Sequence, residues 1–126
     1  MKKKKFCTAI NCMDGRVQLP ANEFLRKYFN AEYVDTITEP GPNLILAKKT
    51  NKKLLDSIIK RTKISVYEHK SVGIAIIGHY DCAGNPSKKK EQVAQIKNSM
   101  KFLQKQFDGI EIIGLWINKK WKASKI

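Results

Sequence analysis

Three residues of types that bind metals, Cys12, His79 and Cys82, form the pattern Cys…His-x-x-Cys along the chain. Thiolate and imidazole are ligands that zinc prefers in proteins. Structural zinc sites are closed by four protein ligands, whereas catalytic sites have three and leave a position for water or substrate. Three candidate ligands therefore favour a catalytic Zn2+ site over a structural one.

A carboxylate and a guanidinium lie close to the first of these cysteines, at Asp14 and Arg16. Asp14 could accept a hydrogen bond from a zinc-bound water and orient it, or it could coordinate zinc as a fourth ligand. Arg16 could decide between these roles, because a guanidinium can hold a carboxylate by a bidentate pair. The simpler alternative is that both residues only cap a loop. Their place beside a candidate ligand favours the catalytic pair.

Apolar and β-branched residues predict four strands. The segments are residues 6–12, 33–38, 73–78 and 110–117. The third segment is apolar throughout, as expected of a central strand that is covered on both faces. Helical segments separate the strands, which predicts a parallel sheet with right-handed crossovers. We therefore expect one α/β domain over residues 1–126, with a mostly parallel four-stranded sheet in the order 2-1-3-4 flanked by helices.

The segments between the strands have apolar residues at helical spacing. The expected helices are residues 20–29, 43–70 with a break near residue 62, and 85–107. Pro20 fits a first helical position, and Asn85 followed by Pro86 fits a cap and a first position. The lysine-rich tail from Asn118 is expected to be coil or a short helix.

The predicted topology brings the candidate ligands together. Cys12 ends the first strand and His79 follows the central strand, and these two strands are expected to be neighbours. Ligands of parallel sheets bind beyond the carboxyl ends of the strands. Cys82 is expected at a turn that leads into a helix, where backbone N–H groups and the helix dipole would favour the thiolate. All three side chains should therefore meet at one edge of the sheet.

Two motifs carry a resemblance to a known family. Residues 12–16, Cys-Met-Asp-Gly-Arg, resemble the Cys-x-Asp-x-Arg motif of β-class carbonic anhydrases. Residues 78–84, Gly-His-Tyr-Asp-Cys-Ala-Gly, resemble their Gly-His-x-x-Cys-Gly motif with one residue inserted before the last glycine. The layout is similar over about residues 6–117, and the chain is most similar to short carbonic-anhydrase-like members. Typical members have a helical arm before the first cysteine, and an Arg-Asn-Ala-Gly segment where residues 39–43 are Glu-Pro-Gly-Pro-Asn.

The resemblance implies a function. In that family two cysteines and a histidine bind zinc, an aspartate pairs with an arginine, and zinc-bound hydroxide converts carbon dioxide reversibly into bicarbonate. The corresponding residues here are Cys12, His79 and Cys82 for zinc, with Asp14 and Arg16 as the pair. Family members are dimers or higher assemblies with the active site near the subunit interface, so a homo-oligomer, specifically a dimer, is expected. Hydrolysis of carbon disulfide or carbonyl sulfide would use the same residues, and a non-catalytic zinc protein that binds polyanions is an alternative of a different class.

The net charge of +14 raises the question of nucleic-acid binding. Only three of the 25 basic residues are arginine, and the lysines form scattered clusters with few aromatic neighbours. Nucleic-acid recognition favours arginine forks and stacking aromatics, so nucleic acid is not the expected partner. No apolar run approaches the roughly 20 residues of a membrane span, and the N-terminus lacks the apolar segment of a signal peptide. With three cysteines, an odd number, the chain is expected in the reducing cytoplasm.

Four further residues have simpler interpretations. Cys7 is expected to be a buried core thiol that points to the opposite face of the first strand from Cys12. His69 should be a surface or helix-end histidine rather than a proton shuttle. Asp81 could support the metal ligands or only form a turn. Trp121 is expected to be a core or interface aromatic.

Overall fold

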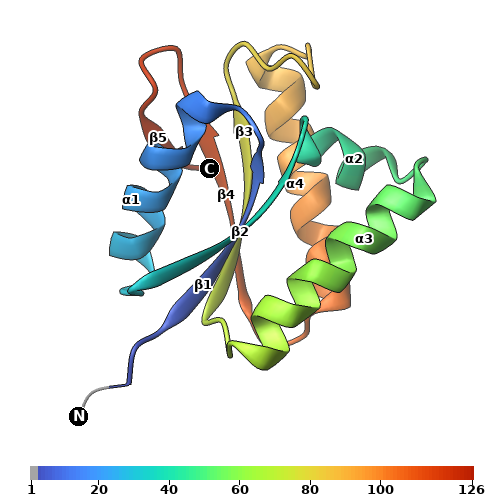
Figure 1. The fold of residues 1–126 in the computed structure, drawn as a ribbon. Coiled ribbons are helices and arrows are strands. Elements are labelled where there is room, and N and C mark those ends of the chain that lie inside the picture. The colour runs from blue at the N-terminus through green and yellow to red at the C-terminus, as the bar shows by residue number, and fades with distance from the viewer. Residues whose placement is uncertain (1–2) are drawn as a thin grey trace.

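The computed structural model describes residues 3–126 and contains a five-stranded sheet in the order β2-β1-β3-β4-β5 (Figure 1). Residues 1 and 2 lie outside the described part. The elements in chain order are β1 (Phe6–Cys12), η1 (Gly15–Val17), α1 (Gln18–Tyr28), β2 (Tyr33–Glu39), α2 (Pro42–Lys48), α3 (Lys52–Lys63), η2 (Ile64–Glu68), β3 (Gly73–His79), α4 (Lys89–Gln106), β4 (Glu111–Ile117) and β5 (Ala123–Lys125).

The first four strands are parallel and confirm the α/β class and the predicted strand order. The fifth strand was not expected, because coil or a short helix was predicted after Asn118. The side chain of Asn118 accepts hydrogen bonds from the backbone N–H groups of Lys120 and Lys122, at 2.9 and 3.1 Å, and so turns the chain back. β5 then pairs antiparallel with β4. Its short, polar sequence has little strand preference, and the free edge of β4 supplies the pairing.

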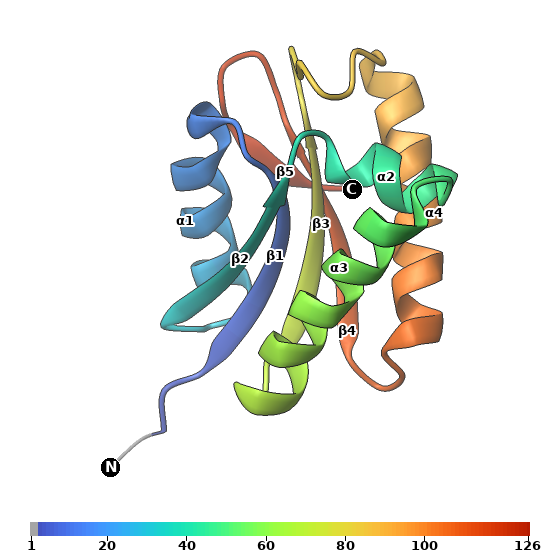
Figure 2. The same cartoon turned by 45° about the vertical axis from the view of Figure 1, so that its right-hand side comes forward.

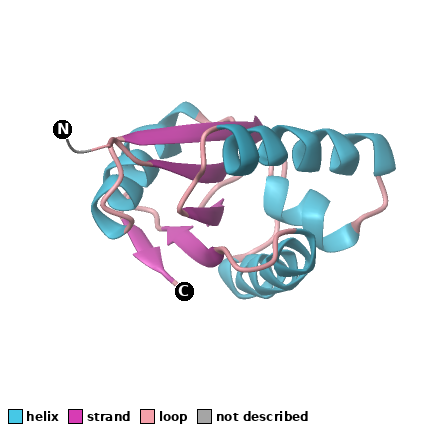
Figure 3. Cartoon of the chain, turned by 90° about the horizontal axis from the view of Figure 1, so that it is seen from below, coloured by secondary structure: helices cyan, strands magenta, loops and turns pink. Residues whose placement is uncertain are grey.

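Helices cover both faces of the sheet, with α1 on one face and α2, α3 and α4 on the other (Figures 1 and 2). Alternate residues of each strand supply the two cores, as the two-residue period of a strand requires. On β3, Ala75 and Ile77 pack on the α1 side, whereas Ile74 and Ile76 pack on the other side. Every residue of β3 is buried, which confirms its central place. Figure 3, seen from below, shows the strands between the two helical layers.

Two helix boundaries differ from the expected ones. α4 begins at Lys89 and not at Pro86, because the Asn85 side chain is buried in the preceding loop, where its Nδ2 donates to Gln95 Oε1 at 2.7 Å. α1 begins at Gln18, so Pro20 is its third residue. Proline is tolerated there because the N–H groups of the first turn have no partner within the helix.

The segment between β2 and β3 forms three helical pieces. An interruption that was not predicted separates α2 from α3, and the side chain of Asn51 caps α3 by accepting from Leu54 N at 3.2 Å. Near the expected break, the helix changes after Lys63 into a wider π turn. Among the described residues no helix combines the length and the apolar character that a membrane crossing requires.

Candidate metal centre

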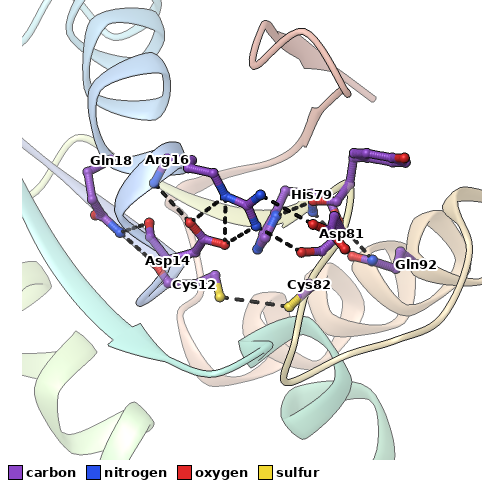
Figure 4. Close-up of polar contacts among 9 residues, drawn as sticks. Cys12, Asp14, Arg16, Gln18, His79, Asp81, Cys82 and Gln92 are labelled. Atoms are coloured by element: carbon purple, nitrogen blue, oxygen red, sulfur yellow. Dashed lines mark hydrogen bonds and ion pairs between the residues drawn. The ribbon is translucent and has the colours of Figure 1, made fainter.

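The carboxyl ends of β1 and β3 bring three potential metal ligands together (Figure 4). Cys12 is the last residue of β1, His79 is the last residue of β3, and Cys82 follows in the next loop. Their potential ligand atoms all lie within 4.8 Å of one another. The two sulfur atoms are 3.8 Å apart. All three residues are buried, so the sheet edge presents a compact donor set of two sulfurs and one nitrogen.

The ring of His79 is fixed so that one nitrogen faces this cluster. Its Nδ1–H donates to the backbone oxygen of Tyr80 at 2.7 Å, which leaves the lone pair on Nε2. Nε2 is buried and has no hydrogen-bond partner among the described residues. Gln92 on α4 holds the strand end, because it accepts from His79 N at 3.2 Å and donates to His79 O at 2.9 Å. A buried nitrogen without a partner is costly, and coordination to a metal ion would satisfy it.

The two thiols of the cluster influence each other's ionisation. A hydrogen bond from Cys82 lowers the pKa of Cys12 to about 4, against the opposing effect of burial. The same hydrogen bond, together with burial, raises the pKa of Cys82. In the metal-free chain the pair therefore shares one proton, whereas a divalent cation would favour two thiolates. Two thiolates and a neutral imidazole are a donor set that fits zinc.

The prediction that a helix dipole acts on Cys82 is wrong, because α4 begins only at Lys89. Backbone N–H groups of Gly84 and Asn85 act on the sulfur instead and favour its thiolate. The loop is held close to the segment after β2. A Cβ atom on Gly84 would lie 2.6 Å from the carbonyl carbon of Pro40, so only glycine fits this contact.

Asp14 and Arg16 form a bidentate ion pair beside the cluster. Arg16 Nη2 donates to Asp14 Oδ2 at 2.7 Å, and Nε donates to Oδ1 at 3.0 Å. Asp14 also caps η1, because its Oδ1 accepts from the backbone N–H of Arg16 at 2.9 Å. The hydrogen bonds from Arg16 lower the pKa of Asp14 to about 2, although burial opposes this. The carboxylate is therefore ionised and held by the arginine.

Three neighbours of this pair were not identified as site residues from the sequence. Gln18 Nε2 donates to the carbonyl oxygens of Cys12 and Asp14, at 2.7 and 2.9 Å, and fixes the loop between them. Asp81 accepts hydrogen bonds from the guanidinium of Arg16. Trp121 lies with its ring 4.3 Å from Arg16 Cζ. Asp81 had a visible signal, its place between two candidate ligands, but Trp121 reaches the site only through the unpredicted β4–β5 turn.

Cys7 is fully buried, which confirms the prediction of a core thiol. Burial raises its pKa to about 11, with a further contribution from Asp35. Cys7 and Cys12 both contact the core cluster that includes α1, which does not decide the face of β1 to which each points, so opposite faces stay a prediction.

His69 is a surface histidine at the end of η2, as predicted. Its Nδ1 is 2.6 Å from Asp35 Oδ2, and its ring stacks on Phe6. These residues lie toward the amino ends of the strands, whereas His79 is at a carboxyl end. His69 is therefore separated from the candidate centre by the length of the sheet.

The fold and the sulfur–nitrogen cluster define an α/β protein with a potential metal centre at the carboxyl edge of its sheet. A family model described as "Putative carbonic anhydrase" matches residues 2–126, and the chain belongs to this family. No protein of the curated set matches the sequence.

Solved structures of β-carbonic anhydrases share the fold. One of two tetrameric β-carbonic anhydrases from the filamentous ascomycete Sordaria macrospora superposes with a TM-score of 0.60 at 13% identity, covering 98% of this chain and 80% of that one. The β-carbonic anhydrase CafA of Aspergillus fumigatus superposes with a TM-score of 0.53 at 10% identity, covering 98% and 75%. At these identities the likeness concerns the fold alone.

Proposed function

We propose that the protein is a zinc enzyme that interconverts carbon dioxide and bicarbonate, with Cys12, His79 and Cys82 as metal ligands and Asp14 and Arg16 as the catalytic pair. The observation that carries the proposal is the buried, unpartnered Nε2 of His79, which faces two thiols beside an ionised carboxylate. Membership of the carbonic anhydrase family supports the choice of reaction.

The three ligands would leave one coordination position for solvent, as in catalytic zinc sites. Zinc bound there would supply Lewis acidity, which lowers the pKa of a coordinated water toward neutrality and so makes a nucleophile available. The two thiolates would cancel the formal charge of the ion, so nearby cationic charge becomes important. Arg16 provides that charge, and its contacts with Asp14 keep it beside the centre.

Asp14 is suited to orient a water molecule because Arg16 fixes its carboxylate beside the candidate ligands. A carboxylate has about four lone-pair sites. Arg16 makes four hydrogen bonds to Asp14, two to each oxygen: the backbone N–H and Nε donate to Oδ1, while Nη2 and, at the longer distance of 3.3 Å, Nε donate to Oδ2. The 3.3 Å contact from Nε to Oδ2 is the longest of these bonds, so Oδ2 is the oxygen that would accept a hydrogen bond from the attacking water and align it with carbon dioxide. While Arg16 holds the carboxylate in this way, Asp14 acts as an orienting acceptor and does not serve as a fourth ligand.

We further propose a homo-oligomer, a dimer, with the site close to the interface. Two exposed apolar side chains adjoin the candidate ligands in sequence, namely those of Met13 and Tyr80, and a third, Leu19, is exposed in the first turn of α1. Burial of such side chains is a common reason for association. The tetrameric state of the Sordaria macrospora enzymes is consistent with assembly in this fold. The cytoplasm remains the proposed location, because ligation requires Cys12 and Cys82 to be reduced.

The test combines metal analysis with stopped-flow hydration of carbon dioxide. The purified chain should contain about one zinc ion, and Cys12→Ser and Cys82→Ser should each lose most of it, because each removes a thiolate ligand. Cys7→Ser is the matched control and should keep zinc, since Cys7 lies at the opposite end of β1. A zinc-loaded chain without hydration above the buffer rate at pH 8.5 would refute the proposed reaction, and full zinc content in both ligand variants would refute the ligands.

A further inference from the structure

The guanidinium of Arg16 is contacted by more than its catalytic partner. Besides the bonds to Asp14, Nη1 donates to Asp81 Oδ2 at 3.2 Å and Nη2 donates to the backbone oxygen of Asp81 at 3.1 Å. The ring of Trp121 lies against the same group, with Cζ 4.3 Å from the ring centroid. Arg16 is therefore held between two carboxylates and an aromatic face (Figure 4 shows the two carboxylates).

These contacts come from two separate parts of the chain. Asp81 lies between His79 and Cys82, and its φ of 57° places its backbone in the left-handed region. Trp121 lies in the turn between β4 and β5, where its N–H donates to Asn118 O at 2.9 Å. The ring centroids of Trp121 and His79 are 6.4 Å apart. The C-terminal hairpin therefore reaches the candidate centre next to both the arginine and the histidine.

Arg16 needs such support to stay in place. Its side chain is 46% exposed, and arginine has many rotamers to lose when it is fixed. An exposed ion pair between residues two apart in sequence contributes little on its own. The contacts with Asp81 and Trp121 restrict the guanidinium to the orientation in which Nε and Nη2 both face Asp14.

We propose that Asp81 and Trp121 are positioning residues that hold Arg16 against Asp14. Their catalytic consequence rests on the proposed function, in which Asp14 orients the attacking water. Without them the guanidinium swings away more often, and Asp14 is then free to turn toward the metal or toward solvent. The C-terminal hairpin is thus part of the active centre through Arg16, although it supplies no metal ligand.

The test uses variants that preserve the local backbone. Asp81→Asn removes the charge, and asparagine, like aspartate, tolerates a positive φ. Trp121→Leu removes the aromatic face, whereas Trp121→Phe keeps one and serves as the conservative variant. Asp108→Asn is the matched control, because Asp108 is exposed and lies after α4.

The first readout is hydrogen exchange of the Arg16 Nε–H, measured by nitrogen-15 NMR on the zinc-loaded chain and repeated on the metal-free chain. Asp81→Asn and Trp121→Leu should each accelerate exchange by about two- to fivefold, the size expected for loss of one exposed ion-pair or cation–π contact. In the double variant, the acceleration of exchange should approach the product of the two single accelerations. Trp121→Phe should exchange at close to the wild-type rate, because it keeps an aromatic ring. Unchanged exchange in the double variant would overturn the proposal.

The second readout is hydration of carbon dioxide by the same zinc-loaded variants, at equal zinc content. We expect the variants with faster exchange of the Arg16 Nε–H to have lower turnover numbers. The control variant Asp108→Asn should keep the wild-type turnover number. Faster exchange at an unchanged turnover number would overturn the positioning role. A wild-type chain that has no hydration activity would refute the proposed function, while the exchange rates would still decide whether Asp81 and Trp121 hold Arg16.

Discussion

Gly84 lies where a single added methyl group should disturb the candidate metal centre. A Cβ atom at this position would be 2.6 Å from the carbonyl carbon of Pro40 and 2.8 Å from its oxygen. Ordinary carbon contacts are about 3.5–4.0 Å, so the two loops must separate by roughly 1 Å. Overpacking of this kind costs about 1–3 kcal/mol. Because Gly84 is two residues from Cys82, the displacement should also weaken zinc binding. We expect a loss of about tenfold in affinity, which is typical when residues that support metal ligands are changed.

Gly15→Ala is the matched control for Gly84→Ala. Gly15 is also close to a candidate ligand, but a Cβ there would meet nothing within 4 Å. Its effect on stability should be near zero or slightly favourable, because alanine restricts the unfolded chain. Urea unfolding of the metal-free variants gives the change in free energy, and competition with a chromophoric chelator gives the zinc affinity. The reasoning fails if Gly84→Ala matches the control in both measurements.

Two further predictions concern ionisation. Carbon-13 NMR should give Asp14 a pKa of about 2 in the folded chain, below the ordinary 3.8, because Arg16 donates to it. The stabilisation from this lowered pKa is fully present above pH 3.8 and is lost as the pH falls through 2; a folded-state pKa of 3.8 would contradict it. Cys7, whose pKa is raised to about 11 by burial, should resist iodoacetamide at pH 7.5 until urea unfolds the chain. Mass spectrometry follows the modification, and equal rates with and without urea would contradict the prediction.

The sequence was most informative where one physical rule decides the structure. The continuous apolar run of β3 predicts its central place, and the parallel topology then predicts that Cys12 and His79 meet at the carboxyl edge. Both features depend on hydrophobic pattern and chain order alone. The sequence alone therefore predicts the fold class and the order of the four parallel strands.

Features that depend on tertiary contacts could not be read in the same way. β5 forms because β4 has a free edge, and no residue between 123 and 125 signals a strand. Asn85 is a residue type that often caps helices, yet its buried side chain donates a hydrogen bond to Gln95 instead. Trp121 contacts Arg16 only because the hairpin turns back over the sheet. A pattern of residue types records local preference, whereas these outcomes follow from partners distant in sequence.

The pairing of β1 with β3 also determines when the candidate centre can assemble during folding. The helices α1, α2 and α3 and the strand β2 lie between these neighbouring strands in the chain, so the contact of β1 with β3 closes a long loop. Long-range parallel pairing is slow, because loop-closure entropy is lost before the new contacts compensate for it. Until that step, a nascent chain has only the local His79–Cys82 pair to offer a metal ion. Metal capture should therefore report completion of the central sheet rather than precede it.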